Sequence, residues 1–295
     1  MTEQFQHAFV ILNYNSASLV QSLLLQIDNN IIQHSKSKII IVDNSESKSE
    51  VQQLLLLKEQ FTNVVIIISN INQGYSAGNN LGLKYCKDNN IKYYTIANPD
   101  IEIPYGFNLD YHLKQLDEFN AVIIGPKVYN PYTNTTQGPY ERPYLLTPIT
   151  DRLKTYVNHI INRQRIDKDL ARPTYMLVGC FFTGTIAKIA DLNFLDENIF
   201  LYYEEFVLAE KIYQTGSIAY YDSDQQVNHK HKVEYKSRKS EFSKNRVMLK
   251  SLRYYYTNIR GYNKLAYRLI EFVLLILLVL KYYSKKIVRI GVSIK

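Results

Sequence analysis

YYTIANPD, residues 93–100, is the stretch of sequence that decides the fold. Its first five residues are apolar and β-prone, which predicts a buried strand, and its last three form a polar turn. Ligands of open α/β sheets bind beyond the carboxyl ends of the strands, which is where Asp100 would lie. A carboxylate there can hold a divalent cation, and the cation a diphosphate, although Asn-Pro-Asp is also an ordinary turn sequence.

The segments around this stretch repeat one pattern, an apolar run followed by a polar turn and an amphipathic stretch. The apolar runs are Ala8–Leu12, Ile39–Val42, Val64–Ile68, Tyr93–Ala97 and Ala121–Ile124. The helix-like stretches between them are Leu19–Ile27, Val51–Glu59, Ala77–Lys87 and Phe107–Leu116. This alternation predicts βαβ units with right-handed crossovers. We therefore expect an α/β fold with a mostly parallel central sheet and helices on both faces.

Size and composition agree with a folded enzyme-sized domain. The chain has 295 residues, of which 46% are hydrophobic, so it can bury a sizeable core. Its two cysteines, Cys86 and Cys180, are far apart, which argues for a reducing compartment and against a disulfide framework. The polar start of the chain lacks the features of a signal peptide, so a cytoplasmic location is expected.

The second half of the chain is less regular. Residues 126–175 are rich in Pro, Asn and Thr and predict a long loop-rich insertion, with one helix near 151–163. Regular structure is expected again at 176–184, and the aromatic run 198–203 is typical of a strand. A helix should follow to about Gln214, with Gly216 as its cap and a last strand at 217–221.

The C-terminal tail differs from the rest in charge. The chain has a net charge of +8, yet residues 227–295 contain 17 Lys and Arg against three acids. The first 226 residues are therefore mildly acidic. We expect a folded α/β domain at 1–226 and a basic, partly apolar helical tail at 227–295.

The tail also contains nine consecutive apolar residues, 272–280, flanked by basic and aromatic residues. Because a membrane span needs roughly 20 apolar residues, a transmembrane helix is not expected. The pattern favours a helix lying in the headgroup layer of an anionic membrane, on its inner face. The alternative is a buried helix that packs on the main domain or on a second subunit, as in a homodimer. The apolar block argues against nucleic acid as the partner.

Polar groups follow the first two predicted strands. Asn13, Tyr14 and Asn15 follow the first, and Asp43 follows the second. An Asp at this edge can hydrogen-bond a nucleobase or a ribose hydroxyl, and it can equally cap the next helix.

A glycine-containing segment comes next, at 72–82 (NQGYSAGNNLG). Its spacing matches neither a dinucleotide-binding loop nor a P-loop. Gly78 and Gly82 share one helical face, which predicts close packing, and Asn72 and Asn79 are expected to face the cleft.

Late in the chain, two carboxylates open a helix and two histidines follow the last strand. Glu204 and Glu205 would be favoured at a helix N-terminus by its dipole, and one of them could instead serve as a general base. His229 or His231 could join Asp100 as a metal ligand, although a lone histidine is more often structural.

Taken in order, these segments resemble the family 2 glycosyltransferases, the inverting enzymes of GT-A fold, and especially their bacterial rhamnosyl- and galactofuranosyltransferase-like branch. The resemblance rests on Val10–Ser16, Ile41–Ser45, Asn72–Gly82, Asn98–Asp100 and Phe200–Glu205, followed by His229. It spans roughly residues 7–232, and the set is specific although each piece alone is not.

The resemblance implies a role for each position. The nucleotide-sugar site would be formed by Asn13, Tyr14, Asn15, Asp43, Asn72, Gly78, Asn79 and Asn98. Asp100, with Asn98 in place of the usual first Asp, and His229 would hold Mg²⁺ or Mn²⁺ on the diphosphate. Glu205, or Glu204 beside it, would take the proton from the acceptor hydroxyl.

The implied activity is inverting, metal-dependent transfer of a hexosyl or deoxyhexosyl group from a UDP- or dTDP-sugar. The implied acceptor is a glycan or a lipid-linked sugar in the synthesis of bacterial capsule, exopolysaccharide or O-antigen. The resemblance places the loop-rich insertion at 126–175 on the acceptor side.

Two departures from the family pattern leave an alternative open. Glu205 stands where the family has Asp, and Val207 stands where it has a second Asp. The loss of that charge keeps open a catalytically degenerate scaffold of a membrane polysaccharide synthesis complex. A nucleotidyltransferase is disfavoured, because residues 13–17 contain neither glycine nor a cation.

Overall fold

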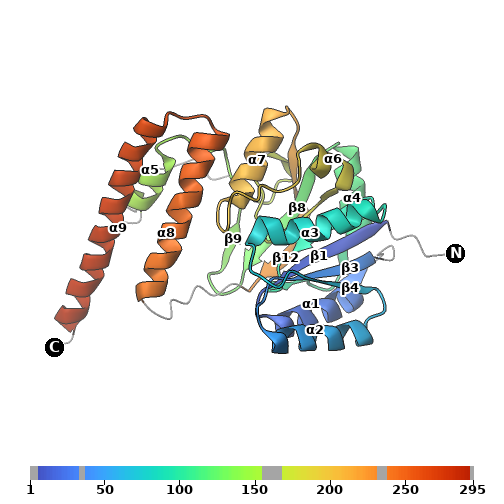
Figure 1. The fold of residues 1–295 in the computed structure, drawn as a ribbon. Coiled ribbons are helices and arrows are strands. Elements are labelled where there is room, and N and C mark those ends of the chain that lie inside the picture. The colour runs from blue at the N-terminus through green and yellow to red at the C-terminus, as the bar shows by residue number, and fades with distance from the viewer. Residues whose placement is uncertain (1–5, 33–36, 155–167, 231–237, 293–295) are drawn as a thin grey trace.

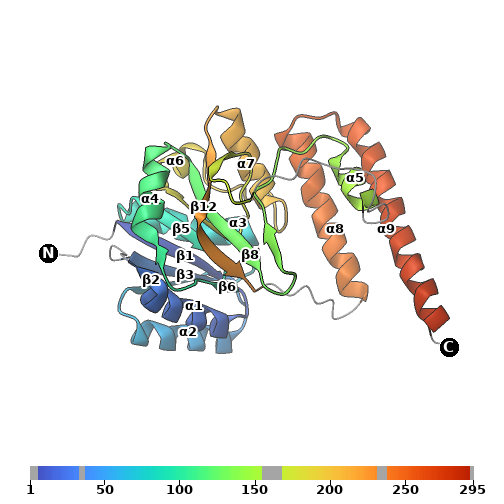
Figure 2. The same ribbon diagram turned by 180° about the vertical axis from the view of Figure 1, so that it is seen from behind.

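The computed structural model describes residues 6–32, 37–154, 168–230 and 238–292. They form a mixed α/β domain around one large sheet, with a pair of long helices beside it (Figure 1 and Figure 2). The strand order along the main path of the sheet is β10-β12-β8-β11-β5-β1-β3-β4. The expected α/β class with a central sheet is therefore confirmed.

The first half of the sheet is parallel, as the alternating pattern predicts. Its strands are β1 (His7–Asn13), β3 (Ser37–Asp43), β4 (Val64–Ile68) and β5 (Tyr93–Ala97). In the register of β1 and β3, Asn13 lies opposite Asp43. The polar residues that end these two strands therefore meet at one edge of the sheet.

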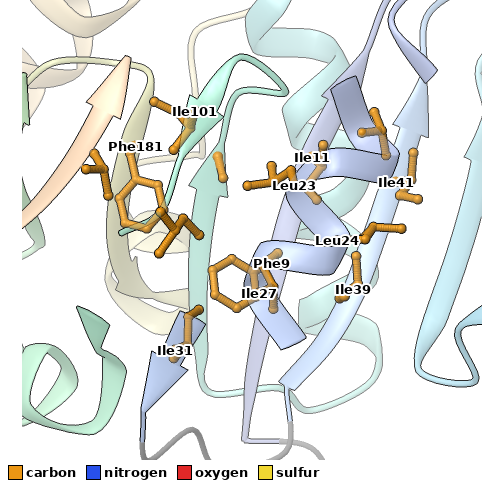
Figure 3. Packing of buried hydrophobic residues seen from close by; sticks show 14 of the residues in the cluster. Phe9, Ile11, Leu23, Leu24, Ile27, Ile31, Ile39, Ile41, Ile101 and Phe181 are labelled. Carbon is orange, nitrogen blue, oxygen red and sulfur yellow. The ribbon is translucent and has the colours of Figure 1, made fainter. Parts of the chain in front are cut away.

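Helices cover both faces of this parallel half. They are α1 (Ala17–Asn30), α2 (Lys48–Gln60) and α3 (Tyr75–Asp88), whereas α4 (Leu109–Glu118) packs on β8, β11 and β12 of the second half. Helix α1 packs its apolar face across β1 and β3: Leu23, Leu24 and Ile27 lie against Phe9, Ile11, Ile39 and Ile41 (Figure 3). Burial of such aliphatic side chains contributes about 1.5–3 kcal/mol each, so this interface fixes the edge at which the strands end.

Helix α3 approaches the opposite face of the sheet very closely because of two glycines. A Cβ on Gly78 would lie 2.4 Å from Cδ1 of Leu12, and one on Gly82 would lie 2.5 Å from Cγ1 of Val10. Any larger residue would push the helix away from β1. The predicted close packing of this helical face is confirmed.

The second half of the sheet mixes directions. Strand β11 (Phe181–Thr185) runs antiparallel to both β5 and β8 (Ile123–Asn130), whereas β12 (Ala219–His229) runs parallel to β8. Three short strands extend the main sheet: β6 (Ile101–Glu102) and β10 (Arg172–Thr174) both pair with β12, and β9 (Thr135–Gln137) pairs with β8. Two further short strands, β2 (Ile31–Ile32) and β7 (Phe107–Asn108), pair with each other in a separate sheet. Strand β12 continues to His229 and so crosses the boundary expected at 226/227.

Two expectations for this half differ from the structure. The aromatic run 198–203 is not a strand; it is a series of bends before α7 (Glu204–Gln214). The Phe200 carbonyl accepts the Tyr75 N–H at the start of α3, and the side chains of Ile199 and Tyr203 pack among tail residues, which accounts for the apolar character of those two positions. The helix expected near 151–163 is observed as α5 (Thr147–Lys154), and the rest of that range lies outside the described residues.

The expected cap of α7 is present. The helix ends at Gln214, and Gly216 has a φ of 73°, a left-handed conformation that glycine adopts without strain. A short helix, α6 (Ile186–Asp191), precedes the loop that leads to α7.

The tail is helical, as expected. It comprises α8 (Arg238–Tyr254), a π-helical turn η1 (Tyr255–Ile259) and α9 (Lys264–Val292). Helices α8 and α9 lie side by side next to the sheet domain, with α5 against α9 (Figure 1 and Figure 2). Among the described residues, no helix is both long and apolar enough to cross a membrane.

Candidate functional site

The ends of β1 and β3 form a buried polar network. The Asn13 side-chain amide donates to Oδ1 of Asp43 (2.9 Å) and to Oε1 of Glu50 (3.1 Å). The same Asp43 oxygen accepts the Ser45 backbone N–H (3.0 Å). Oδ2 of Asp43 is buried and has no hydrogen-bond partner among the described residues. A buried acceptor without a donor is costly, so this oxygen is suited to receive an N–H or O–H group of a ligand.

The residues that follow β1 turn out toward solvent. Tyr14 is 54% exposed, and Asn15 adopts a left-handed backbone (φ 52°) with its N–H donating to Oγ of Ser45 (2.8 Å). Asn13 and Asp43 are thus brought together as predicted from the strand ends, and Tyr14 and Asn15 border them.

The segment before α3 is held by its own turn. The Asn72 side chain accepts the Gly74 N–H (3.0 Å). Gly74 has a φ of 87°, and a Cβ there would lie 2.2 Å from the Phe200 carbonyl oxygen, so only glycine fits. The next residue, Tyr75, donates its N–H to that same carbonyl (2.9 Å). The start of α3 is therefore locked to the segment that precedes α7.

Gly78 and Asn79 lie inside the packed interface of α3 and the sheet. Asn79 is fully buried, and its amide donates to the Tyr75 carbonyl of its own helix (3.0 Å). Its Oδ1 has no partner among the described residues. The structure gives Gly78 a packing function, and the predicted place of both residues in a nucleotide-sugar site stays a prediction.

Asp100 and His229 meet, although 129 residues separate them in the sequence. Asn98, whose N–H donates to the Cys180 carbonyl (2.8 Å), starts the turn that carries Asp100 past the end of β5. Nε2 of His229 lies 3.3 Å from Oδ2 of Asp100. Nδ1 of His229 donates to Oε1 of Gln137 on β9 (2.8 Å), a bond that orients the ring.

This pair fits a divalent cation as a partial ligand set. A carboxylate oxygen and an imidazole nitrogen are both ligands for Mn²⁺, and the second nitrogen of the ring is already oriented by Gln137. Among the described residues, no group of three or more His, Cys, Asp or Glu could hold a metal. Any further ligands would have to come from a substrate or from water. His231 lies outside the described residues.

Glu204 and Glu205 form the first turn of α7 and are mostly withdrawn from water. Burial, together with the charge of Glu205, raises the pKa of Glu204, while the backbone amides of Glu204 and Tyr202 act in the opposite direction. Burial also raises the pKa of Glu205. Two adjacent carboxyls with raised pKa values are suited to hold or accept a proton near neutral pH.

The segment Gly179–Cys180 brings the two carboxylate groups of the site toward each other. Burial, and then the charges of Asp100 and Glu205, raise the pKa of the Cys180 thiol. A Cβ on Gly179 would lie 3.8 Å from Oε2 of Glu205. The hydroxyl of Tyr75 donates to the Gly179 carbonyl (2.5 Å). Asp100 and Glu205 therefore both lie near the Gly179–Cys180 segment.

Val207 is not part of this region. It is 1% exposed and packs in the apolar cluster formed with Leu249, Leu252 and Tyr255 of the tail. The absence of a charge at this position follows from the burial of this side of α7 under the tail helices. Val207 therefore gives no support to a degenerate site.

Several residues of the site were not predicted from the sequence. Glu50 and Ser45 complete the network around Asn13, Gln137 orients His229, and Tyr75 contacts Gly179. The sequence signal for Ser45 was its place just after a strand end. No local pattern marks Gln137 or Glu50, because their partners come from distant segments.

The comparison with known families gives a direct match. A profile described as "Glycosyl transferase family 2" matches residues 8–186, which is more than half of the chain. Among curated proteins, the low-salt glycan biosynthesis hexosyltransferase Agl10 of Haloferax volcanii is 26% identical over 206 residues. The match covers 67% of this chain and 58% of Agl10, so the chain spans less than two thirds of that relative.

Solved structures share the fold at low identity. GalNAc-T7, crystallised with UDP, GalNAc and Mn²⁺, superposes with a TM-score of 0.60 at 14% identity, covering 87% of this chain and 51% of that one. TarS 1–349 of S. aureus superposes with a TM-score of 0.57 at 14% identity, covering 92% and 71%. These neighbours have the GT-A fold, which confirms the fold expected for this chain. On its fold and on the profile match, the chain belongs to glycosyl transferase family 2.

Proposed function

We propose that the protein transfers a hexosyl or deoxyhexosyl group from a UDP- or dTDP-sugar to a hydroxyl of a glycan or lipid-linked acceptor, with inversion. The observation that carries this proposal is that three different groups lie toward the carboxyl edge of the parallel strands. They are the unpartnered oxygen of Asp43, the Asp100–His229 pair and the buried carboxyls of Glu204 and Glu205. An acceptor for a base or ribose, a cation platform and a proton acceptor are the parts that such a transfer requires.

In this proposal each group acts at its own position. Asp43 accepts a hydrogen bond from the nucleoside and fixes its register. Asp100 and His229 would hold Mg²⁺ or Mn²⁺, which when bound supplies positive charge to the leaving diphosphate. Glu205, or Glu204 beside it, accepts the proton of the attacking hydroxyl, which would approach past Gly179. GalNAc-T7 and TarS, which have been crystallised with UDP, support a nucleotide as the common ligand of this fold.

The experiment that tests the proposal measures nucleotide release from a panel of UDP-, dTDP- and GDP-sugars, with Mn²⁺, Mg²⁺ or chelator. The expected result is metal-dependent turnover of a UDP- or dTDP-sugar that Asp100→Asn abolishes. Asp88→Asn, at an exposed position of α3, is the matched control and should retain it. A folded wild-type protein that turns over none of these donors would contradict the proposal.

We also propose that the protein works at the inner face of a membrane, as an enzyme of surface polysaccharide synthesis would, with helix α9 on an anionic bilayer. An apolar stripe of exposed side chains runs along α9 at Leu265, Leu269, Phe272, Ile276 and Val279. Spacings of three and four residues place them on one face. The only acid of α9, Glu271, is buried and paired with Arg253, whereas Lys264 and Arg268 are exposed. An apolar face with only positive charge around it is complementary to anionic lipid.

A further inference from the structure

The segment that presents Glu204 and Glu205 has an unusual backbone. Tyr202 and Tyr203, directly before α7, have φ values of 69° and 70°. This left-handed conformation is strained for bulky L-residues, and two in a row persist only when surrounding contacts hold them. The backbone amide of Tyr202 lowers the pKa of the Glu204 carboxyl, against the larger effect of burial.

The contacts that hold this turn come from the tail. Oγ of Ser251 on α8 donates to the Leu201 carbonyl (2.9 Å). Nζ of Lys244, also on α8, lies 5.2 Å from the centre of the Tyr202 ring. The ring of Tyr203 packs against Tyr255 of η1, with centroids 6.4 Å apart. Each of the three residues 201–203 therefore meets its own tail partner.

The other side of the same segment is fixed by α3. The Tyr75 N–H donates to the Phe200 carbonyl (2.9 Å), the carbonyl directly before the one that Ser251 binds. Two successive carbonyls of the chain thus accept hydrogen bonds, one from the sheet domain and one from the tail. Removal of the Ser251 hydrogen bond would therefore weaken one of the two backbone contacts that oppose relaxation of the turn.

We infer that the tail is part of the catalytic apparatus: Ser251, Lys244 and Tyr255 are positioning residues that hold the left-handed Tyr202–Tyr203 turn and so aim Glu204 and Glu205 into the site. This inference rests on the proposed function for its kinetic consequence, but the positioning itself has a separate signature. The tail then positions Glu204 and Glu205 in addition to the membrane binding proposed for α9.

The test compares Ser251→Ala with Ser243→Ala, the same substitution at an exposed position of the same helix. With the UDP- or dTDP-sugar turned over by wild type, Ser251→Ala should lower kcat about ten- to a hundredfold, the range that a small misplacement of a reacting group costs. The KM of Ser251→Ala for the donor should stay at the wild-type value. The control variant Ser243→Ala should keep the wild-type melting temperature. Lys244→Met, at a partly exposed position, gives a second, milder variant that should fold normally.

Two further readouts separate positioning from general stability and from the proposed function. In a Glu204→Gln, Glu205→Gln double background, Ser251→Ala should have no further effect on kcat, because both carboxyls that it positions are already gone. Titration of carboxyl-¹³C glutamate by NMR should show the raised pKa values of Glu204 and Glu205 move in Ser251→Ala and remain in Ser243→Ala. This titration needs no turnover, so it reports on positioning even if the donor panel fails. Unchanged carboxyl titration and unchanged kcat in Ser251→Ala, or equal losses with and without the two carboxyls, would overturn the inference.

Discussion

The two halves of the candidate site are built in different ways. The half around Asn13 and Asp43 consists of residues that directly follow two neighbouring parallel strands, whose register brings them together. The half around Glu204 and Glu205 depends on a left-handed turn that is held by a helix 50 residues later in the chain. The family profile covers the first half and ends at residue 186, before the second begins.

Because the two halves are held by different contacts, a substitution can alter one half of the site without altering the other. Strand ends in a parallel sheet are held in place by the core, so the half around Asn13 and Asp43 keeps its geometry as long as the sheet is folded. The half around Glu204 and Glu205 is held by a tertiary partner, α8, which lies beside the helix α9 that carries the exposed apolar stripe. Substitutions should therefore separate nucleotide binding from turnover, and turnover should depend on the tail.

The largest expected effect is on turnover when the candidate base is removed. Glu205→Gln should lower kcat about 10²–10⁴-fold, the usual contribution of a placed proton acceptor, with the donor KM nearly unchanged. The measurement is steady-state release of UDP or dTDP. Glu59→Gln, at an exposed position of α2, should behave as wild type. Equal loss in Glu204→Gln and none in Glu205→Gln would assign the base to Glu204.

The next effect is on stability and tests the interface between α7 and the tail. Val207→Asp, which introduces the acid usual in the family, places a charge in the buried cluster with Leu249 and Tyr255. We expect a loss of about 3 kcal/mol in the free energy of unfolding, as for other unpaired buried charges. Thermal melting measures it, with Val279→Asp on the exposed face of α9 as control. A Val207→Asp protein as stable as the control would show that the tail does not pack on α7.

The lipid proposal predicts an intermediate effect. The double variant Leu269→Glu, Phe272→Glu should reduce binding to phosphatidylglycerol-containing vesicles about tenfold or more, because each buried apolar side chain contributes about 1.5–3 kcal/mol. Co-sedimentation measures it, and Leu56→Glu on the exposed face of α2 is the matched control. A stable dimer that the double variant disrupts, with no vesicle binding by wild type, would assign the apolar stripe to a second subunit instead.

The smallest effect concerns pH. Burial, and then the charge of Glu205, raises the pKa of Glu204 in the folded state. Above about pH 4.5 the unfolded chain therefore binds fewer protons at this residue than the folded protein does. Wild-type stability therefore falls between that pH and the raised pKa. Glu204→Gln removes this loss and should melt at least about 2–4 °C higher at pH 8, with the gain shrinking toward pH 4.5. A gain independent of pH, or one also seen in Glu59→Gln, would argue against the raised pKa.

Much of the fold and part of the site could be predicted from the sequence. The strands at 64–68 and 93–97 agree with the structure residue for residue, because short apolar runs between turns are a local signal. Asn13 and Asp43 meet for the same reason, since parallel strands end at a common edge. The contact of Asp100 with His229 was expected only through the family resemblance, because no local pattern relates residues so far apart.

The left-handed turn and the position of Val207 could not be predicted in this way. Tyrosine rarely adopts positive φ, so an aromatic run such as 198–203 indicates a strand until its tertiary contacts are known. Charge and the apolar block at 272–280 indicated a helical tail correctly, but they carry no information about which surface of the domain it covers. The helix faces settle this: Val207 of α7 and Leu249 of α8 are buried together.

The measurement that tests the central claim most directly is calorimetric titration of UDP and of dTDP, each with Mn²⁺, into wild type, Asp43→Asn, Glu205→Gln and Ser251→Ala. Wild type, Glu205→Gln and Ser251→Ala should bind one nucleotide equally well, and Asp43→Asn should bind it about 10–100-fold more weakly, the usual cost of a lost charged hydrogen bond. Folded wild-type protein that binds neither nucleotide, or Asp43→Asn that binds as tightly as wild type, would contradict the central claim.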